Sequence, residues 1–239
     1  ADSKGDYSGA LCTRVRSLTT GLNRLIFTEN DLEDTELFDQ NVIVDISRVG
    51  SMETKSLIMG ILVMKLNEYR MVSGEMNSGL KHITVLEEAH NLLKRTSTEQ
   101  SSESSNLLGK SVELLANSIA EMRTYGEGFI IADQSPGLLD MSAIRNTNTK
   151  IILRLPDQSD RELVGYAAGL DKEQIQELAR LERGVAAVYQ NDWVEPVLVQ
   201  IEKCNIEEKL YEECITVNAV DLENVKGQIL NFLLQGRVY

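Results

Sequence analysis

The chain has 239 residues, with 24 Lys plus Arg against 37 Asp plus Glu, so its formal net charge at pH 7 is −13. This length suffices for one large α/β domain or two small ones. Non-specific affinity for nucleic acid comes from neutralising phosphates, and an acidic chain has no general basic field to do so. The composition therefore argues against a free-standing DNA-binding module, but it is compatible with a ring-shaped assembly that carries a local basic loop.

The cysteines indicate a reduced, cytoplasmic protein. Cys12, Cys204 and Cys214 are odd in number and lack paired metal-ligand spacing, and the chain has only two histidines. The longest apolar stretch, residues 56–64, is too short to cross a bilayer, and the N-terminal residues lack a signal-peptide pattern. We therefore expect no membrane association.

Six short runs rich in apolar and β-branched residues predict strands at residues 41–46, 83–87, 128–132, 150–155, 185–189 and 194–201. The first four runs are almost continuously apolar, which is typical of parallel strands covered by helices on both faces. The last two are joined through Asn191 and Asp192 and predict an antiparallel β-hairpin.

Apolar residues at helical spacing predict helices at residues 52–71, 106–125, 158–168 and 172–181. The alternation of strands and helices predicts an α/β fold with a mostly parallel sheet flanked by helices. Residues 96–105, rich in Ser, Thr and Glu, predict a mobile loop. A further helical pattern at residues 206–239 predicts a helical tail that packs on the core, with contact to the next subunit as the alternative.

Two acidic residues stand where the predicted strand 83–87 ends. Glu87 and Glu88 would lie at the carboxyl edge of the sheet, where open α/β sheets bind ligands. Phosphoryl transfer needs one acid near Mg²⁺ and its waters, here Glu87, and one near the attacking water, here Glu88. The alternative is that the two acids simply face solvent where the chain changes direction.

Gln134 follows the next predicted strand and could sense a γ-phosphate or orient water, although a plain turn residue before Pro136 is the alternative. Arg123 lies near the end of a predicted helix, where it could interact only with the helix dipole. A sharper hypothesis is that Arg123 is an arginine finger donated to a neighbouring subunit.

The chain contains no recognisable P-loop. That loop needs Gly, four residues, and then Gly-Lys-Ser/Thr, so that backbone N–H groups surround the phosphates. Gly109, Lys110 and Ser111 fit only in part, because Ser104 stands where the first Gly is required and the site follows Glu88 instead of preceding it. We expect Lys110 to be an exposed helix residue.

Four segments, in this order, resemble the C-terminal half of the HerA-like branch of P-loop ATPases, close to FtsK-type and conjugation-type pumps: residues 86–90, 123–126, 129–136 and 146–155. The likeness extends to residues 41–47 and 184–201 and so covers the chain from about residue 10 to 201. It implies a RecA-like (ASCE) P-loop NTPase core that uses ATP and Mg²⁺. It also implies a hexameric ring acting on duplex DNA with a nuclease or other effector partner.

The resemblance also implies a role for each candidate residue. The Glu88 position activates water, Glu87 supports Mg²⁺ through water, Gln134 senses the phosphate, and Arg123 is a candidate finger in trans. Two positions depart from the family pattern. Asp is usual at Glu87, so the reach to the metal is one methylene longer, and Lys is usual at Thr124, which weakens any basic contact there.

These features predict an N-terminal segment at 1–40 that follows a missing P-loop part, an ATPase core at 41–203 and a helical tail at 204–239. Either the P-loop lies upstream or the chain has lost nucleotide binding. The lack of an evident first strand favours truncation, with the isolated chain inactive. Three functions stay open: a DNA-moving ATPase motor, a conjugation-type pump for protein or pilus subunits, and a non-catalytic assembly module.

Overall fold

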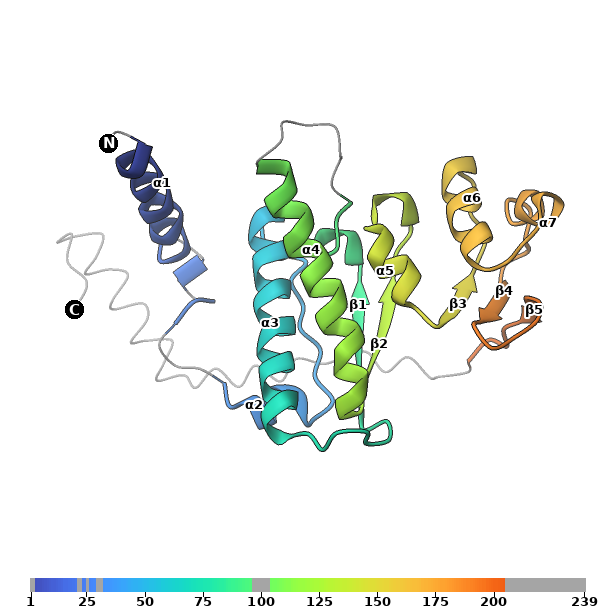
Figure 1. Ribbon diagram of the computed structural model, residues 1–239, viewed down its shortest axis with the longest axis horizontal. Helices are drawn as coiled ribbons and strands as arrows, with labels where there is room; N and C mark the ends of the chain where they lie inside the picture. Colours follow the sequence, from blue (N-terminus) through green and yellow to red (C-terminus); the bar gives the residue numbers. More distant parts are fainter. Residues whose placement is uncertain (1–2, 21–22, 25, 29–31, 96–103, 205–239) are drawn as a thin grey trace, which may run out of the picture. The chain divides into compact units, whose positions relative to one another are not determined.

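The computed structural model describes residues 3–20, 23–24, 26–28, 32–95 and 104–204 (Figure 1). The chain divides into two compact units, Ala1–Ile201 and Glu202–Tyr239, and every element below belongs to the first. The predicted tail at 206–239, Cys214 and most of the predicted loop at 96–105 lie outside the described residues. Cys12 and Cys204 are exposed and form no disulfide.

Two parallel strands form the sheet that carries the candidate residues. Strand β1 (His82–Glu87) pairs with β2 (Glu127–Ala132) in a register that runs from His82 opposite Glu127 to Glu87 opposite Ala132. Both strands were predicted, each starting one residue later than observed. Because the pair is parallel, the two carboxyl ends meet at one edge.

Helices α3 (Met52–Ser73) and α4 (Ser104–Glu121) lie beside this strand pair, and the 3₁₀ turn η3 (Met122–Tyr125) leads from α4 into β2 (Figure 1). Ser51 begins α3, because its side chain accepts a hydrogen bond from the Thr54 N–H. Val63 and Leu66 of α3 are buried in one core together with Leu86 and Met122. Both helices were predicted, with ends within two residues of those observed for α3.

A second sheet has its own core. Strands β3 (Thr149–Ile152), β4 (Val185–Gln190) and β5 (Val197–Gln200) pair antiparallel in the order β3-β4-β5. Helices α6 (Gln158–Ala167) and α7 (Lys172–Glu177) pack closely, since a Cβ at Gly165 would lie 2.5 Å from Cγ1 of Ile175. Asp171 caps α7 through a capping box with Gln174.

Three predictions about the sheet were wrong. The described strands form two sheets rather than one, and the strand expected at 150–155 pairs antiparallel with β4. Residues 41–46 form no strand, and the Ile43 side chain is 95% exposed. A strand requires a hydrogen-bonded neighbour, and none of the described strands pairs with this segment.

Three helices were missed: α1 (Ser3–Leu18), α2 (Asp34–Phe38) and α5 (Met141–Asn146). Helix α1 leaves Leu11 and Val15 exposed, so it lacks the clear apolar face that would predict a helix. Helix α7 is also shorter than the predicted 172–181. Within the described residues, no helix combines the length and apolar character needed to cross a membrane.

Candidate functional site

The carboxyl edge of β1 and β2 gathers the polar residues that follow the two strands. Glu88 comes directly after β1 and begins the 3₁₀ turn η2 (Ala89–Asn91) in a left-handed conformation, with φ 49° and ψ 50°. For a residue with a Cβ this conformation costs about 1–3 kcal/mol and is frequent at functional sites. Asn91 helps to hold it, because its backbone N–H and its side-chain amide each donate to the Glu88 carbonyl at 2.9 Å.

Gln134 and Glu88 are in direct contact across this edge. The Gln134 Nε2 donates to the Glu88 Oε1 at 2.6 Å, although the residues are 46 positions apart in the chain. Gln134 is exposed, and 43% of the Glu88 side chain is accessible. The sequence predicted that adjoining strands would bring these two side chains together, and the structure confirms this proximity.

The structure adds two residues that the sequence reasoning did not select. His90 of η2 and Asp133 after β2 are in hydrogen-bonding contact, with 2.9 Å between the His90 Nδ1 and the Asp133 Oδ2. The same Nδ1 lies 3.5 Å from the Glu88 Oε2. Asp133 could have been found from its place, since it follows β2 as Glu88 follows β1.

The other two predicted residues lie apart from this contact. Glu87 ends β1 with an exposed side chain that has no hydrogen bond or ion pair within the described part of the chain. Arg123 is exposed in η3, ahead of the first residue of β2, and so belongs to the opposite edge. Six strand residues span about 20 Å, which prevents Arg123 from reaching Gln134 in the same chain.

The residues at this edge fit part of a magnesium nucleotide site. Mg²⁺ prefers oxygen ligands and keeps several waters, and the free, exposed carboxylate of Glu87 suits that chemistry. Ligand atoms of Glu88, His90 and Asp133 also lie within 4.8 Å of one another. An imidazole nitrogen suits a transition metal better than Mg²⁺, so this group does not fit a magnesium ion. The sequence of these 239 residues contains no Gly, four residues and Gly-Lys-Ser/Thr pattern of a phosphate-binding loop.

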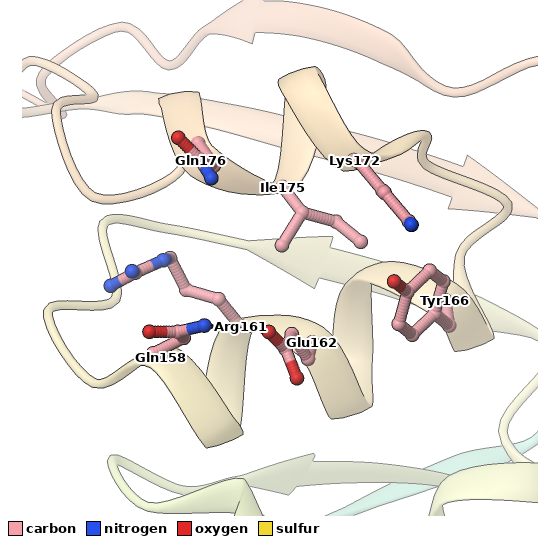
Figure 2. Close-up of a pocket in the computed structure, with 7 residues that line it drawn as sticks. All are labelled: Gln158, Arg161, Glu162, Tyr166, Lys172, Ile175 and Gln176. Atoms are coloured by element: carbon pink, nitrogen blue, oxygen red, sulfur yellow. Dashed lines mark hydrogen bonds between the residues drawn. The ribbon is translucent and has the colours of Figure 1, made fainter.

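A cavity of about 460 Å³ lies between α6 and α7 (Figure 2). Tyr166 and Lys172 lie at one end of it, and Arg161 lies at the other. The cavity is lined by Gln158, Arg161, Glu162, Tyr166, Lys172, Ile175 and Gln176. None of the residues predicted from the sequence contributes to it, so it is separate from the Glu88–Gln134 contact.

Several curated proteins are similar to this chain. It is 28% identical over 207 residues to the DNA double-strand break repair helicase HerA of Sulfurisphaera tokodaii, a match that covers 84% of this chain and 40% of the relative. It is 34% identical over 131 residues to the HerA helicase of Sulfolobus acidocaldarius, covering 53% of this chain and 24% of that protein. The chain thus spans less than half the length of these relatives.

No family model matches the chain. A genome packaging NTPase, B204 from Sulfolobus turreted icosahedral virus 2 in complex with sulfate, matches with a TM-score of 0.49 and 11% identity over 78% of each chain.

The fold and the edge residues define an α/β protein with a Glu–Gln pair at the carboxyl ends of two parallel strands. The chain resembles HerA/FtsK-like P-loop ATPases, as its motifs predicted.

Proposed function

We propose that this chain is part of an ATP-hydrolysing motor that moves duplex DNA. The observation that carries the proposal is the 2.6 Å hydrogen bond from Gln134 to Glu88 at the carboxyl edge of two parallel strands. Ligands of open α/β sheets bind at such an edge. The names of the HerA relatives, which are DNA repair helicases, support DNA as the substrate.

In the proposed reaction Glu88 accepts a proton from the water that attacks the γ-phosphate. Glu88 is suited to this task because its carboxylate is partly exposed and fixed by the Gln134 amide. Gln134 would contact the γ-phosphate and so report its presence to Glu88. A bound Mg²⁺ would neutralise phosphate charge, and the Glu87 carboxylate would hold it through water.

We further propose that polypeptide outside these 239 residues supplies the P-loop, so the isolated chain is inactive. Parallel strands normally have both faces covered. Here three apolar side chains of β1 and β2 are about half exposed: Ile83 (47%), Val85 (53%) and Ile130 (51%). An additional layer of structure would cover them.

The remaining roles concern the assembly. Because Arg123 is exposed and far from Gln134, it would serve the site of a neighbouring subunit as a finger in trans. This requires a homo-oligomer, for which we propose a hexameric ring in the cytoplasm. A nuclease or another effector would be the partner of that ring.

The first test is Glu88→Gln in the full-length protein that contains this chain. The amide cannot accept the water proton, so we expect ATP turnover to fall by about 10²–10⁴-fold while ATP binding persists. Steady-state hydrolysis and equilibrium nucleotide binding measure the two quantities. Glu113→Gln, an exposed glutamate on α4, is the matched control and should hydrolyse ATP at the wild-type rate. Unchanged turnover in Glu88→Gln would remove Glu88 from the mechanism.

A second test concerns the substrate. Linear duplex DNA should stimulate ATP turnover by the full-length protein, whereas a pump for protein substrates need not respond to it. Calorimetry of the isolated 239-residue chain with ATP and Mg²⁺ should detect no tight site. A sub-micromolar affinity would show that the phosphate-binding loop lies within this chain after all.

A further inference from the structure

We infer that His90 and Asp133 form a positioning pair that orients the Glu88 carboxylate for its reaction. This inference rests on the proposed function of Glu88. His90 and Asp133 would make no contact with the substrate and would act through Glu88.

The Asp133 carboxylate is a hydrogen-bond acceptor with fixed partners at the carboxyl edge of β1 and β2. Only 3% of its side chain is exposed, and its carboxylate accepts three hydrogen bonds. The Asp133 Oδ2 accepts from the His90 backbone N–H at 2.8 Å and from the His90 Nδ1 at 2.9 Å, and Oδ1 accepts from the Ser135 N–H at 2.8 Å. The two bonds from His90 tie the turn after β1 to the turn after β2, and the bond from Ser135 fixes Asp133 within its own turn.

The contact with Asp133 determines which His90 nitrogen carries a proton. A carboxylate only accepts hydrogen bonds, so the proton between the two groups belongs to the His90 Nδ1. The same Nδ1 lies 3.5 Å from the Glu88 Oε2. The Gln134 amide therefore donates to Oε1 of Glu88, whereas the His90 ring, whose Nδ1 hydrogen is directed to Asp133, lies against the Oε2 side at 3.5 Å.

Restricting the Glu88 side chain matters for the reaction proposed for its carboxylate. Glu88 has an unusual backbone conformation and a side chain that is nearly half exposed, so without partners its carboxylate would sample several rotamers. A displacement of about 1 Å in a reacting group can cost about 10²-fold in rate. His90, anchored by the nearly inaccessible side chain of Asp133, limits that freedom.

The test compares two substitutions of His90 in the full-length protein. Asn places its amide nitrogen near the position of Nδ1, whereas Gln places it near Nε2. His90→Asn should therefore keep kcat for ATP hydrolysis within about threefold of wild type, and His90→Gln should lower it by about 10²-fold with KM within about twofold. Asp133→Asn should also lower kcat. An amide has a single oxygen, so it cannot accept from His90 and from Ser135 on two separate oxygens as the carboxylate does.

His82→Asn is the matched control, since His82 also pairs through Nδ1 with a buried carboxylate but lies at the other end of β1. It should leave kcat unchanged. Melting temperatures of all variants are measured first, and turnover is compared below the lowest of them, so that loss of folding is not read as loss of positioning.

Wild-type kcat in His90→Gln, with Glu88→Gln inactive, would overturn the positioning role while the proposed function stands. Equal losses in His90→Asn and His90→Gln, accompanied by release of a bound transition metal, would also overturn it and identify a metal ligand instead. If Glu88→Gln itself hydrolyses ATP normally, the proposed function fails, and that result is read independently of the His90 variants.

Discussion

The two histidines of this chain lie at opposite ends of the same strand pair, and each contacts a carboxylate. At the amino end, which we call the closed end, His82 contacts Glu127 at 2.8 Å. At the carboxyl end, which we call the open end, His90 contacts Asp133 at 2.9 Å and faces Glu88. The residue types are alike, so their surroundings must decide what each pair does.

The closed end is a buried and fully bonded network. The Glu127 side chain has no exposed area and accepts from the Arg70 Nε at 2.9 Å and from the Thr84 hydroxyl at 2.7 Å as well as contacting His82. Arg70 also forms an ion pair with Asp39 at 2.8 Å and donates a hydrogen bond to the Phe38 carbonyl. Such a network joins α2 and α3 to the start of the sheet and leaves no carboxylate oxygen of Glu127 for a ligand.

The open end has two properties that a reaction requires, namely solvent access and a carboxylate without a fixed partner. Glu88 is 43% exposed on its side chain, and Glu87 is exposed without a partner among the described residues. A His–carboxylate contact is therefore not by itself evidence of a functional site. Burial of the acid and the number of its fixed partners separate a structural pair from a reactive one.

The largest expected difference between the ends is in stability. Glu127→Gln removes the buried one of the two carboxylate partners of Arg70 and should lower the free energy of unfolding by about 2 kcal/mol, because a buried hydrogen bond between charged groups contributes about 1.5–3 kcal/mol while the Asp39 partner remains. Glu88→Gln should change it by less than about 0.5 kcal/mol, as is usual for accessible positions. Urea unfolding of the two variants side by side measures both values, and equal losses would contradict the comparison.

A smaller effect should appear when the pH is lowered. The hydrogen bond from Arg70, followed by that from Tyr69, lowers the pKa of Asp39 below the ordinary 3.8. Asp39 therefore stabilises the folded state above pH 3.8, and this contribution disappears as the pH falls through the lowered folded-state pKa. The stability difference between wild type and Asp39→Asn should be greatest near pH 7 and shrink in acid. A difference that grows in acid would have the wrong sign.

The sequence predicted those parts that depend on local pattern. Strands β1 and β2 and helices α3 and α6 followed from apolar runs and helical spacing, and the Glu88–Gln134 contact followed from parallel pairing. The segment at 41–46 was wrongly expected to be a strand, because strand formation depends on a neighbour that the pattern does not reveal.

The two added residues at the open end show the other limit of sequence reasoning. His90 and Asp133 are 43 positions apart, and neither has a local pattern that marks it as paired. The register of the two strands brings them together, and only a tertiary structure provides that register. Glu127, at the first position of β2, would likewise be assigned to the surface by its charge alone, yet it is buried.

We propose that Glu88 and Gln134 act as one unit, and a double-mutant cycle on ATP turnover by the full-length protein measures whether they do. Residues that act together show non-additive losses. We predict that Glu88→Gln combined with Gln134→Ala reduces kcat no further than Glu88→Gln alone, within about threefold. If the two losses instead multiply, Glu88 and Gln134 act independently, and the shared site proposed for the open end is contradicted.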